Sequence, residues 1–232
     1  MERLDKIISA TGKYTRREVK ALVRQGRVAV DGVPADAPEK KVDPEAMEIL
    51  VDGVPIGYEK FTYLMLHKPA GVLSAVEDSR QKTVLDLLPP EMKKRGLSPV
   101  GRLDKDTEGL LLLTNDGELT HRLLSPKSHV DKVYYARVEG CLEPEDADAF
   151  AAGIQLSDFT CLPAGLELLS DSECLVTVHE GKFHQVKRML AARGKNVTYL
   201  KRLRMGSLEL DKMLEKGQFR PLSAEELRGL KG

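Results

Sequence analysis

The sequence predicts an α+β protein of two domains. Three observations indicate this. Two amphipathic helical patterns followed by short strands open the chain, a stretch with Gly and Pro but no periodicity covers residues 52–58, and the rest of the chain mixes strand and helix patterns. We therefore expect a small N-terminal domain with its linker over residues 1–58 and a larger domain over residues 59–232.

The composition is that of an ordinary globular protein. The 232 residues suffice for one or two domains, and 41% hydrophobic with 31% charged content is usual for such chains. No apolar run approaches the roughly 18 residues of a membrane span, and the N-terminus lacks the apolar core of a signal peptide. The three cysteines form no CxxC pair, which favours a reducing compartment. We expect a cytoplasmic protein that contacts no membrane.

Charge is segregated along the chain although the net charge is zero. Residues 1–30 carry eight basic and three acidic side chains, and residues 182–204 carry eight basic ones and no acid. Residues 139–180 carry ten acids and no lysine or arginine. Because the local field decides where a polyanion binds, this distribution is compatible with nucleic acid despite the neutral sum.

Turn and cap signals divide the first domain into two helices and two strands. A first helix over residues 2–11 ends at Gly12, and a capping box at Thr15 and Glu18 starts a second helix that ends near Gly26. Strands follow over residues 27–30, with an Asp31-Gly32 hairpin signal, and over residues 47–51. This order resembles the S-four RNA-binding module, through Arg3-Leu4-Asp5-Lys6, Arg16-Arg17 and Gly26-Arg27-Val28-x-Val30-x-Gly32. The alternative is a basic helix that only faces solvent.

The second domain begins with a strand, a turn and a short helix. We expect the strand over residues 62–66, the turn over residues 67–74 and the helix over residues 82–88, where Pro89-Pro90 stops it. The turn contains Lys68-Pro69-Ala70-Gly71, and we interpret Lys68 as structural rather than catalytic.

The stretch from Val100 to Thr114 joins a charge cluster to a strand. Leu110 to Leu113 is a short apolar run that fits a strand buried on both faces. Charged residues directly before such a strand are costly unless they are paired or point into a cleft. On the pattern alone, a solvated turn with an incidental ion pair remains an equal alternative.

The run Gly101-Arg102-Leu103-Asp104-x-Asp106-Thr107-x-Gly109-Leu110 resembles the signature of RNA pseudouridine synthases of the RsuA type. The resemblance implies that Asp104 is catalytic and that the second domain has a mixed, mostly antiparallel sheet flanked by helices. It implies isomerisation of uridine to pseudouridine in ribosomal RNA. No nucleotide, metal or redox cofactor is expected, and we assign Asp106 a turn-stabilising role.

Further strands and helices follow the cluster. We expect helices over residues 118–124 and 144–152, and strands over residues 132–138, 159–169 and 174–179, the last two as antiparallel neighbours. On the first of these strands, the Lys132-x-Tyr134 spacing resembles the family's base-stacking tyrosine. Tyr134 would stack on the target base while Tyr135 faces the opposite side, since strand residues alternate. The alternative is that both tyrosines belong to the core.

A second motif covers residues 180–190, Glu-Gly-Lys-Phe-His-Gln-Val-Lys-Arg-Met-Leu. We expect a helix with Phe183, Val186 and Leu190 on one face. The motif resembles the family's closing segment, and the resemblance implies that Lys187 pairs with Asp104. Its His-Gln-x-Lys-Arg form is similar to that of enzymes of the small ribosomal subunit. More strand over residues 196–210 and a capping box at Ser223 to Glu226 complete the chain.

The substrate expected from the resemblance is ribosomal RNA, and 16S rRNA is favoured. The RNA could be free or part of a pre-ribosomal particle. We expect the protein to act as a monomer. The alternatives are a target in 23S rRNA or tRNA, a non-catalytic RNA-binding assembly factor, and a metal nuclease built on Asp104 and Asp106, for which no third carboxylate has suitable spacing. The side chains expected to contact RNA are Arg3, Lys6, Arg16, Arg17, Lys20, Arg27, Arg102, His184, Gln185, Arg188, Lys201 and Arg202.

Overall fold

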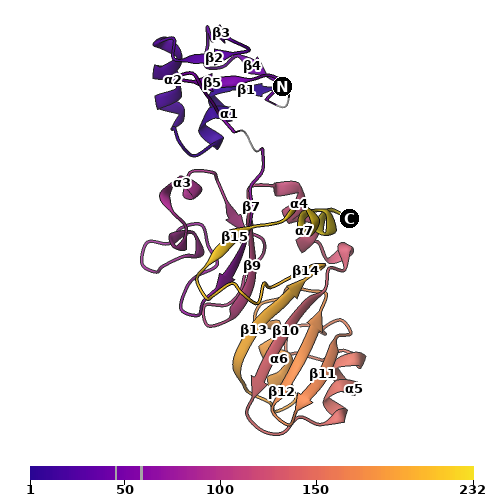
Figure 1. Cartoon of the computed structure of the whole chain (residues 1–232). Helices are drawn as coiled ribbons and strands as arrows, with labels where there is room; N and C mark the ends of the chain where they lie inside the picture. The colour runs from indigo at the N-terminus through magenta and orange to yellow at the C-terminus, as the bar shows by residue number, and fades with distance from the viewer. Residues whose placement is uncertain (45, 58–59) are drawn as a thin grey trace. The chain divides into compact units, whose positions relative to one another are not determined.

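A computed structural model describes residues 1–44, 46–57 and 60–232. The chain separates into two compact units (Figure 1): unit 1 comprises Met1–Thr62 and Leu88–Leu97, and unit 2 comprises Tyr63–Leu87 and Ser98–Gly232. The domain boundary that we expected at residues 58 and 59 lies outside the described residues.

Unit 1 packs two helices against short antiparallel strands. Helices α1 (Leu4–Ala10) and α2 (Arg16–Arg24) bury Leu4, Ile7, Val19 and Leu22 in one apolar cluster with the sheet. The expected capping box is present, because Thr15 and Glu18 each accept a hydrogen bond from the other's backbone N–H. Strand β1 (Glu2–Arg3) pairs with β4 (Lys41–Val42), and α3 (Pro90–Lys93) is the third helix of the unit. A separate sheet has the strand order β3 (Val33–Pro34), β2 (Val28–Val30), β5 (Ile49–Val51) and β6 (Val54–Pro55).

The stretch that we expected to be a linker forms part of this sheet instead. Strand β2 (Val28–Val30) pairs with β3 (Val33–Pro34), and β5 (Ile49–Val51) pairs with β6 (Val54–Pro55). Asp31 and Asp52 both have φ near +50°, and a glycine with positive φ follows each of them. Two successive residues with positive φ suit a two-residue hairpin turn. Asp52-Gly53 is therefore a second hairpin turn, and the prediction of a linker from residue 52 was wrong.

Unit 2 is built on a mixed sheet of nine strands among the described residues. The strand order is β11-β12-β10-β13-β9-β7-β15, with β14 beside β13 and β8 beside β9. All pairs are antiparallel except β13 with β9. This confirms the expected mixed, mostly antiparallel sheet. The strands are β7 (Tyr63–Lys68), β8 (Ser98–Pro99), β9 (Glu108–Thr114), β10 (Lys132–Val138), β11 (Gly165–Ser170), β12 (Glu173–Val178), β13 (Val197–Met205), β14 (Leu208–Glu209) and β15 (Phe219–Pro221).

Strand β9 is the central element of unit 2, and all seven of its residues are buried. Leu110 and Leu112 pack in a cluster with Leu119 of α4 (Gly117–Leu124) and Leu230 of α7 (Ala224–Lys231). The other helices are α5 (Pro144–Ala152), α6 (Gln185–Ala192) and two single-turn 3-10 helices at Val84–Leu87 and Pro126–Ser128. The strand predicted from the Leu110–Leu113 run is therefore confirmed.

Three predicted elements differ most from the structure. The helix expected over residues 82–88 is only the 3-10 turn Val84–Leu87. The strand expected from residue 159 starts at Gly165, because Pro163 has no N–H to donate to a ladder. The helix expected from residue 180 starts at Gln185, because His184 has a left-handed backbone with φ of 50°. Phe183 consequently lies outside the helix and is 72% exposed rather than buried on its apolar face.

No helix among the described residues is long and apolar enough to cross a membrane.

Candidate active site

Asp104 lies in the turn that leads into β9. Ser74 anchors the residue before it, since its hydroxyl donates to the Leu103 carbonyl at 2.8 Å and accepts from the Leu103 N–H at 3.0 Å. The Thr107 N–H donates to the Asp104 carbonyl at 3.1 Å and closes the turn. At Gly109, which has φ of +106°, an added Cβ would lie 2.2 Å from the Arg202 carbonyl oxygen on β13. Only glycine therefore allows β9 to approach β13 at the end of this turn.

Lys68 supports the same turn from inside the protein. Its side chain has no exposed surface, and its ammonium group donates to the carbonyls of Asp104 at 3.0 Å, Lys105 at 3.2 Å and Thr107 at 2.8 Å. A fourth bond of 3.0 Å goes to Pro69. Burial lowers the pKa of Lys68 to about 8. Lys68 contacts only backbone oxygens in these bonds, in agreement with the structural interpretation of this lysine.

Lys187 of α6 reaches the Asp104 side chain from the other side. Its Nζ lies 3.1 Å from Asp104 Oδ2 and 2.6 Å from Asp106 Oδ1. Burial lowers the pKa of Lys187, but hydrogen bonds to Asp106 and Asp104 outweigh this and raise it. The hydrogen bond from Lys187 lowers the pKa of Asp106. The structure thus brings together the two residues that the motifs suggested as a pair.

Asp106 does more than the sequence analysis assigned to it. Its side chain is 75% exposed and bonds Lys187, while the turn itself is closed by backbone groups and by Lys68. The contact with Lys187 adds to the turn-stabilising role that we expected of Asp106, which stays a prediction. One cation is shared by two carboxylates, because Asp104 and Asp106 both point toward α6.

His184 is a further partner of Asp104 that the sequence analysis did not identify. Its Nε2 lies 3.4 Å from Asp104 Oδ1. His184 precedes Lys187 by three residues, a spacing that places two side chains on one helix face. That spacing was the available signal in the sequence, although in the structure His184 lies just outside the helix, as the left-handed residue directly before α6 begins at Gln185.

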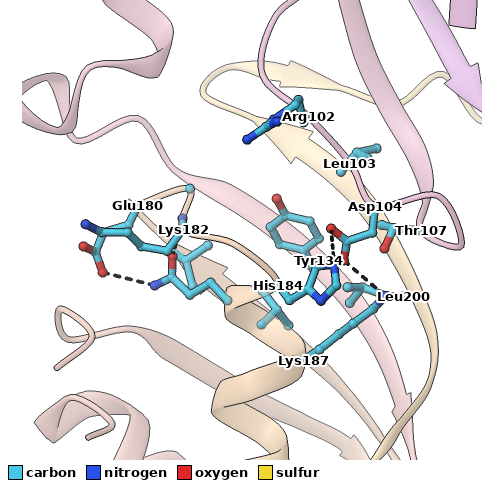
Figure 2. Close-up of a pocket in the computed structure, with 14 residues that line it drawn as sticks. Arg102, Leu103, Asp104, Thr107, Tyr134, Glu180, Lys182, His184, Lys187 and Leu200 are labelled. Atoms are coloured by element: carbon cyan, nitrogen blue, oxygen red, sulfur yellow. Dashed lines mark hydrogen bonds and ion pairs between the residues drawn. The ribbon is translucent and has the colours of Figure 1, made fainter. Parts of the chain in front are cut away.

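A cleft opens beside this group of charges, and Tyr134 of β10 lines it (Figure 2). Tyr134 is 9% exposed. Figure 2 shows Asp104, Tyr134, His184 and Lys187 gathered at one end of the cleft, with Glu180 and Lys182 at the other. The apolar lining includes Leu103, Val178 and Leu200. A flat ring and a carboxylate therefore face one space whose lining is partly apolar and partly charged.

The residues expected to contact RNA separate into exposed and buried ones. Arg102 and His184 line the cleft and are exposed. Arg202 is only 2% exposed, and its Nε donates to the Leu110 carbonyl at 2.8 Å, so the expectation that it contacts RNA is corrected. The Gln185 side chain is buried, and its amide donates to Glu180 at 3.1 Å. Alternation along β13 turns Arg202 inward, whereas Gln185 is buried at the start of α6, and basic composition alone reveals neither.

The other basic candidates lie elsewhere. Arg188 is paired with Asp158, and Lys201 lines a separate hollow with His67 and Leu214. In unit 1, Arg27 is paired with Asp52 and Lys6 with Glu2. A hollow in that unit is lined by Arg3, Asp5, Arg16, Arg17 and Lys20.

Comparison with known proteins agrees with this fold. Residues 62–192 match the family of RNA pseudouridylate synthases, and residues 2–47 match the S4 domain. A crystal structure of a pseudouridylate synthase superimposes with a TM-score of 0.70 at 36% identity, covering 99% of this chain and all of that one. The family match covers more than half of the chain and shows that the protein is an RNA-modifying isomerase. The chain belongs to the RNA pseudouridylate synthase family and is a pseudouridine synthase with an N-terminal S4 domain.

The curated relatives are similar over almost their whole length. An uncharacterized RNA pseudouridine synthase of Bacillus subtilis (strain 168), YtzG, is 48% identical over 97% of this chain and 96% of its own. The ribosomal small subunit pseudouridine synthase A of Vibrio cholerae is 41% identical over 98% of this chain and 99% of its own. The Escherichia coli (strain K12) protein of the same name is 38% identical over 97% of this chain and 98% of its own.

Proposed function

We propose that this chain isomerises a uridine of the small-subunit ribosomal RNA, 16S rRNA, and does so in the cytoplasm as a monomer. Relatives that share about two residues in five with it over nearly their full length are named for the small ribosomal subunit. The observation that carries the proposal is the position of Asp104, held by Lys187 and His184 at the edge of a cleft lined by Tyr134.

Asp104 is the proposed catalytic carboxylate. The reaction breaks the bond between the ribose and a ring nitrogen, turns the base and joins it again through a ring carbon, so the substrate and product have the same atoms. A carboxylate takes part as nucleophile or base only when it is ionised. Lys187, whose Nζ lies 3.1 Å from Asp104 Oδ2, holds the side chain toward the cleft.

Tyr134 is proposed to stack on the base that enters the cleft. A uridine must leave its stack to be reached, which costs a few kcal/mol, and stacking on an aromatic ring returns about 1–3 kcal/mol. Tyr134→Phe keeps the ring and separates stacking from any role of the hydroxyl. If Tyr134→Ala binds and turns over RNA as well as the wild type, Tyr134 is only a core residue.

The S4 domain is proposed to position the RNA through phosphate contacts. The hollow lined by Arg3, Arg16, Arg17 and Lys20 concentrates positive charge on one part of unit 1. Phosphate contacts orient RNA but do not read its sequence. The residue that is isomerised is therefore selected at the cleft, and the S4 domain supplies affinity.

The decisive test maps pseudouridine across total RNA from cells with and without this protein. We expect one site in 16S rRNA to lose its modification and to regain it when the gene is restored, but not when the restored protein carries Asp104→Asn. Loss confined to 23S rRNA or tRNA would replace the proposed substrate while leaving the enzyme class unchanged.

A second test concerns the S4 domain. Neutralising Arg16 and Arg17 together as glutamine should weaken binding to 16S rRNA and lower the slope of log Kd against log salt by about two. Lys40→Gln, at an exposed lysine paired with Asp36, is the matched control in the same unit. An unchanged slope in the double variant would mean that these arginines do not contact phosphates.

A further inference from the structure

Two aromatic side chains form a stack beside Asp104. The rings of Phe183 and His184 lie 3.8 Å apart between centroids, with 18° between their planes. His184 lines the cleft and reaches Asp104, whereas Phe183 is not among the residues that line it. The order from the inside outward is therefore Asp104, the His184 ring and the Phe183 ring.

The outer ring is unusually exposed. Phe183 is 72% exposed, although phenylalanine is among the side chains most often buried. Its stack with His184 covers one face of the ring, and the exposed fraction leaves surface for another flat group. The structure turns this ring out of the apolar face of α6 through the left-handed backbone at His184.

The surroundings of Phe183 favour a polyanion with flat groups. Its neighbours Lys182 and Lys187 are basic, and residues 182–204 contain no acidic side chain. Single-stranded nucleic acids bind where positive charge accompanies exposed aromatic rings. Lys187 is already paired with Asp104 and Asp106, and Arg188 with Asp158, so among these three the positive charge available to a phosphate beside Phe183 is that of Lys182.

We propose that the outer face of Phe183 is a stacking subsite for the RNA base adjacent to the one held in the cleft. The inference rests on the proposed function, because it takes an RNA nucleotide as the occupant of the cleft. The flanking base continues the stack that His184 and Phe183 begin. His184 joins this subsite to the site of reaction, because the same ring contacts Asp104 and supports Phe183.

The experiment measures RNA affinity while the flanking base and the Phe183 ring are each removed, separately and together. A first short RNA strand carries a single uridine among abasic nucleotides, and two others add one adenosine on the 5′ or the 3′ side of it. We expect an adenosine on one of the two sides to tighten binding to the wild-type protein by about 10-fold, the usual effect of stacking one base on an aromatic ring. A strand of abasic nucleotides alone gives the reference affinity.

Protein variants then locate the effect. Phe183→Leu keeps an apolar side chain without a ring, and the gain from adenosine should disappear. Phe183→Trp keeps a ring and should retain the gain. Met213→Leu is the matched control, since Met213 is 86% exposed on unit 2 and is not among the residues that line the cleft. Circular dichroism of each variant checks the fold.

The outcomes separate this inference from the proposed function. If the uridine strand binds no better than the abasic reference, the assignment of the cleft fails. If the uridine strand binds better but adenosine adds nothing, or adds as much in Phe183→Leu, the stacking subsite is overturned. Self-association that depends on Phe183 would show that a second copy of the chain occupies the ring instead, and would also overturn the proposal.

Discussion

Two lysines hold the same turn and differ in almost every physical respect. Lys68, at the end of β7, has no exposed surface and donates only to backbone carbonyls in its four hydrogen bonds. Lys187, on α6, has a side chain that is 22% exposed and contacts two carboxylates. Burial lowers the pKa of Lys68 to about 8, whereas hydrogen bonds to Asp106 and Asp104 raise that of Lys187 against the effect of its burial.

The difference shows how one residue type serves two purposes. Carbonyl oxygens carry partial charge and cannot move without moving the chain, so Lys68 holds the backbone of residues 104–107. Carboxylates carry full charge on rotatable side chains, so Lys187 holds the direction of Asp104 and leaves the backbone untouched. We therefore expect Lys68 to act mainly on stability and Lys187 mainly on reactivity. Changes to the turn and to each lysine test this division.

Asp104→Asn should have the largest effect. The substitution preserves size and the carbonyl that Lys68 binds, but removes the charge that Lys187 contacts. Isomerisation should fall about 1,000-fold or more, as for loss of a catalytic group elsewhere, and the Tm should change by less than about 3 °C. Tritium release from labelled uridine and thermal unfolding measure the two effects. Activity within about tenfold of the wild type would refute the assignment of Asp104.

Lys68→Met should cost the most stability. The Pro69 and Thr107 carbonyls lose their bonds to Lys68, and unpaired buried groups cost about 1–3 kcal/mol each. We expect the free energy of unfolding to fall by about 2–4 kcal/mol and the Tm by roughly 5–10 °C. The matched variant is Lys187→Met, whose stability change should stay below about 1 kcal/mol. Equal losses in the two variants would remove the distinction between the lysines.

Lys187→Met should reduce activity while leaving the fold. Without the cation, Asp104 retains only His184 and can turn away from the cleft, and a misplaced catalytic group costs about 100-fold. Lys187→Arg keeps the charge but presents it as a planar fork, so it should recover part of the loss. Turnover under saturating RNA tests this. Full activity in Lys187→Met would mean that His184 or Arg102 supplies the charge.

The smallest expected effect is a difference between the two lysines in the pH dependence of activity. Lys68 has a pKa near 8, so its ammonium form is lost as pH rises through about 8, and with it the donors that shape the turn. Activity should therefore decline above that pH, while Lys187 stays charged because its pKa is raised. The lowered pKa of Lys68 has the opposite effect on stability. Between a pH of about 8 and the unfolded pKa near 10.5, Lys68 is protonated in the unfolded chain but not in the native protein. The contribution of Lys68 to the free energy of unfolding therefore becomes more favourable to the native protein as the pH rises through this range.

A combined measurement separates the effect of Lys68 deprotonation on activity from its effect on stability. Activity and Tm are followed from neutral to alkaline pH in the wild type and in Lys187→Arg. The decline in activity should persist in Lys187→Arg and precede any fall in Tm. A flat activity profile up to pH of about 9.5 would show that Lys68 keeps its proton in the native protein.

The sequence by itself determined the elements with strong local signals. The capping boxes at Thr15 and Ser223 define helix starts because the side chains bond N–H groups three residues away. The Leu110–Leu113 run defined a buried strand because no other element of that length hides four leucines. Asp104 and Lys187 were found through motifs whose residues are close in the chain. The Gly and Pro around residue 53 misled the prediction, because the same residues suit linkers and tight hairpins.

Only the tertiary structure decided which charged side chains meet. Lys68 precedes the carbonyls it binds by up to 39 residues, and Lys187 follows Asp106 by 81. The spacing of residues along the chain does not report such contacts, and the pairing of Lys187 with Asp104 was expected only from the family resemblance. Arg202 is basic like its half-buried neighbours Lys201 and Arg204, yet it is fully buried because β13 lies between β10 and β9 and turns that side chain inward. The left-handed turn at His184 likewise depends on the packing around α6, and it alone places one ring against Asp104 and the next in solvent. Sequence specifies which groups are present, but their energies depend on distance and burial, and those are properties of the folded chain.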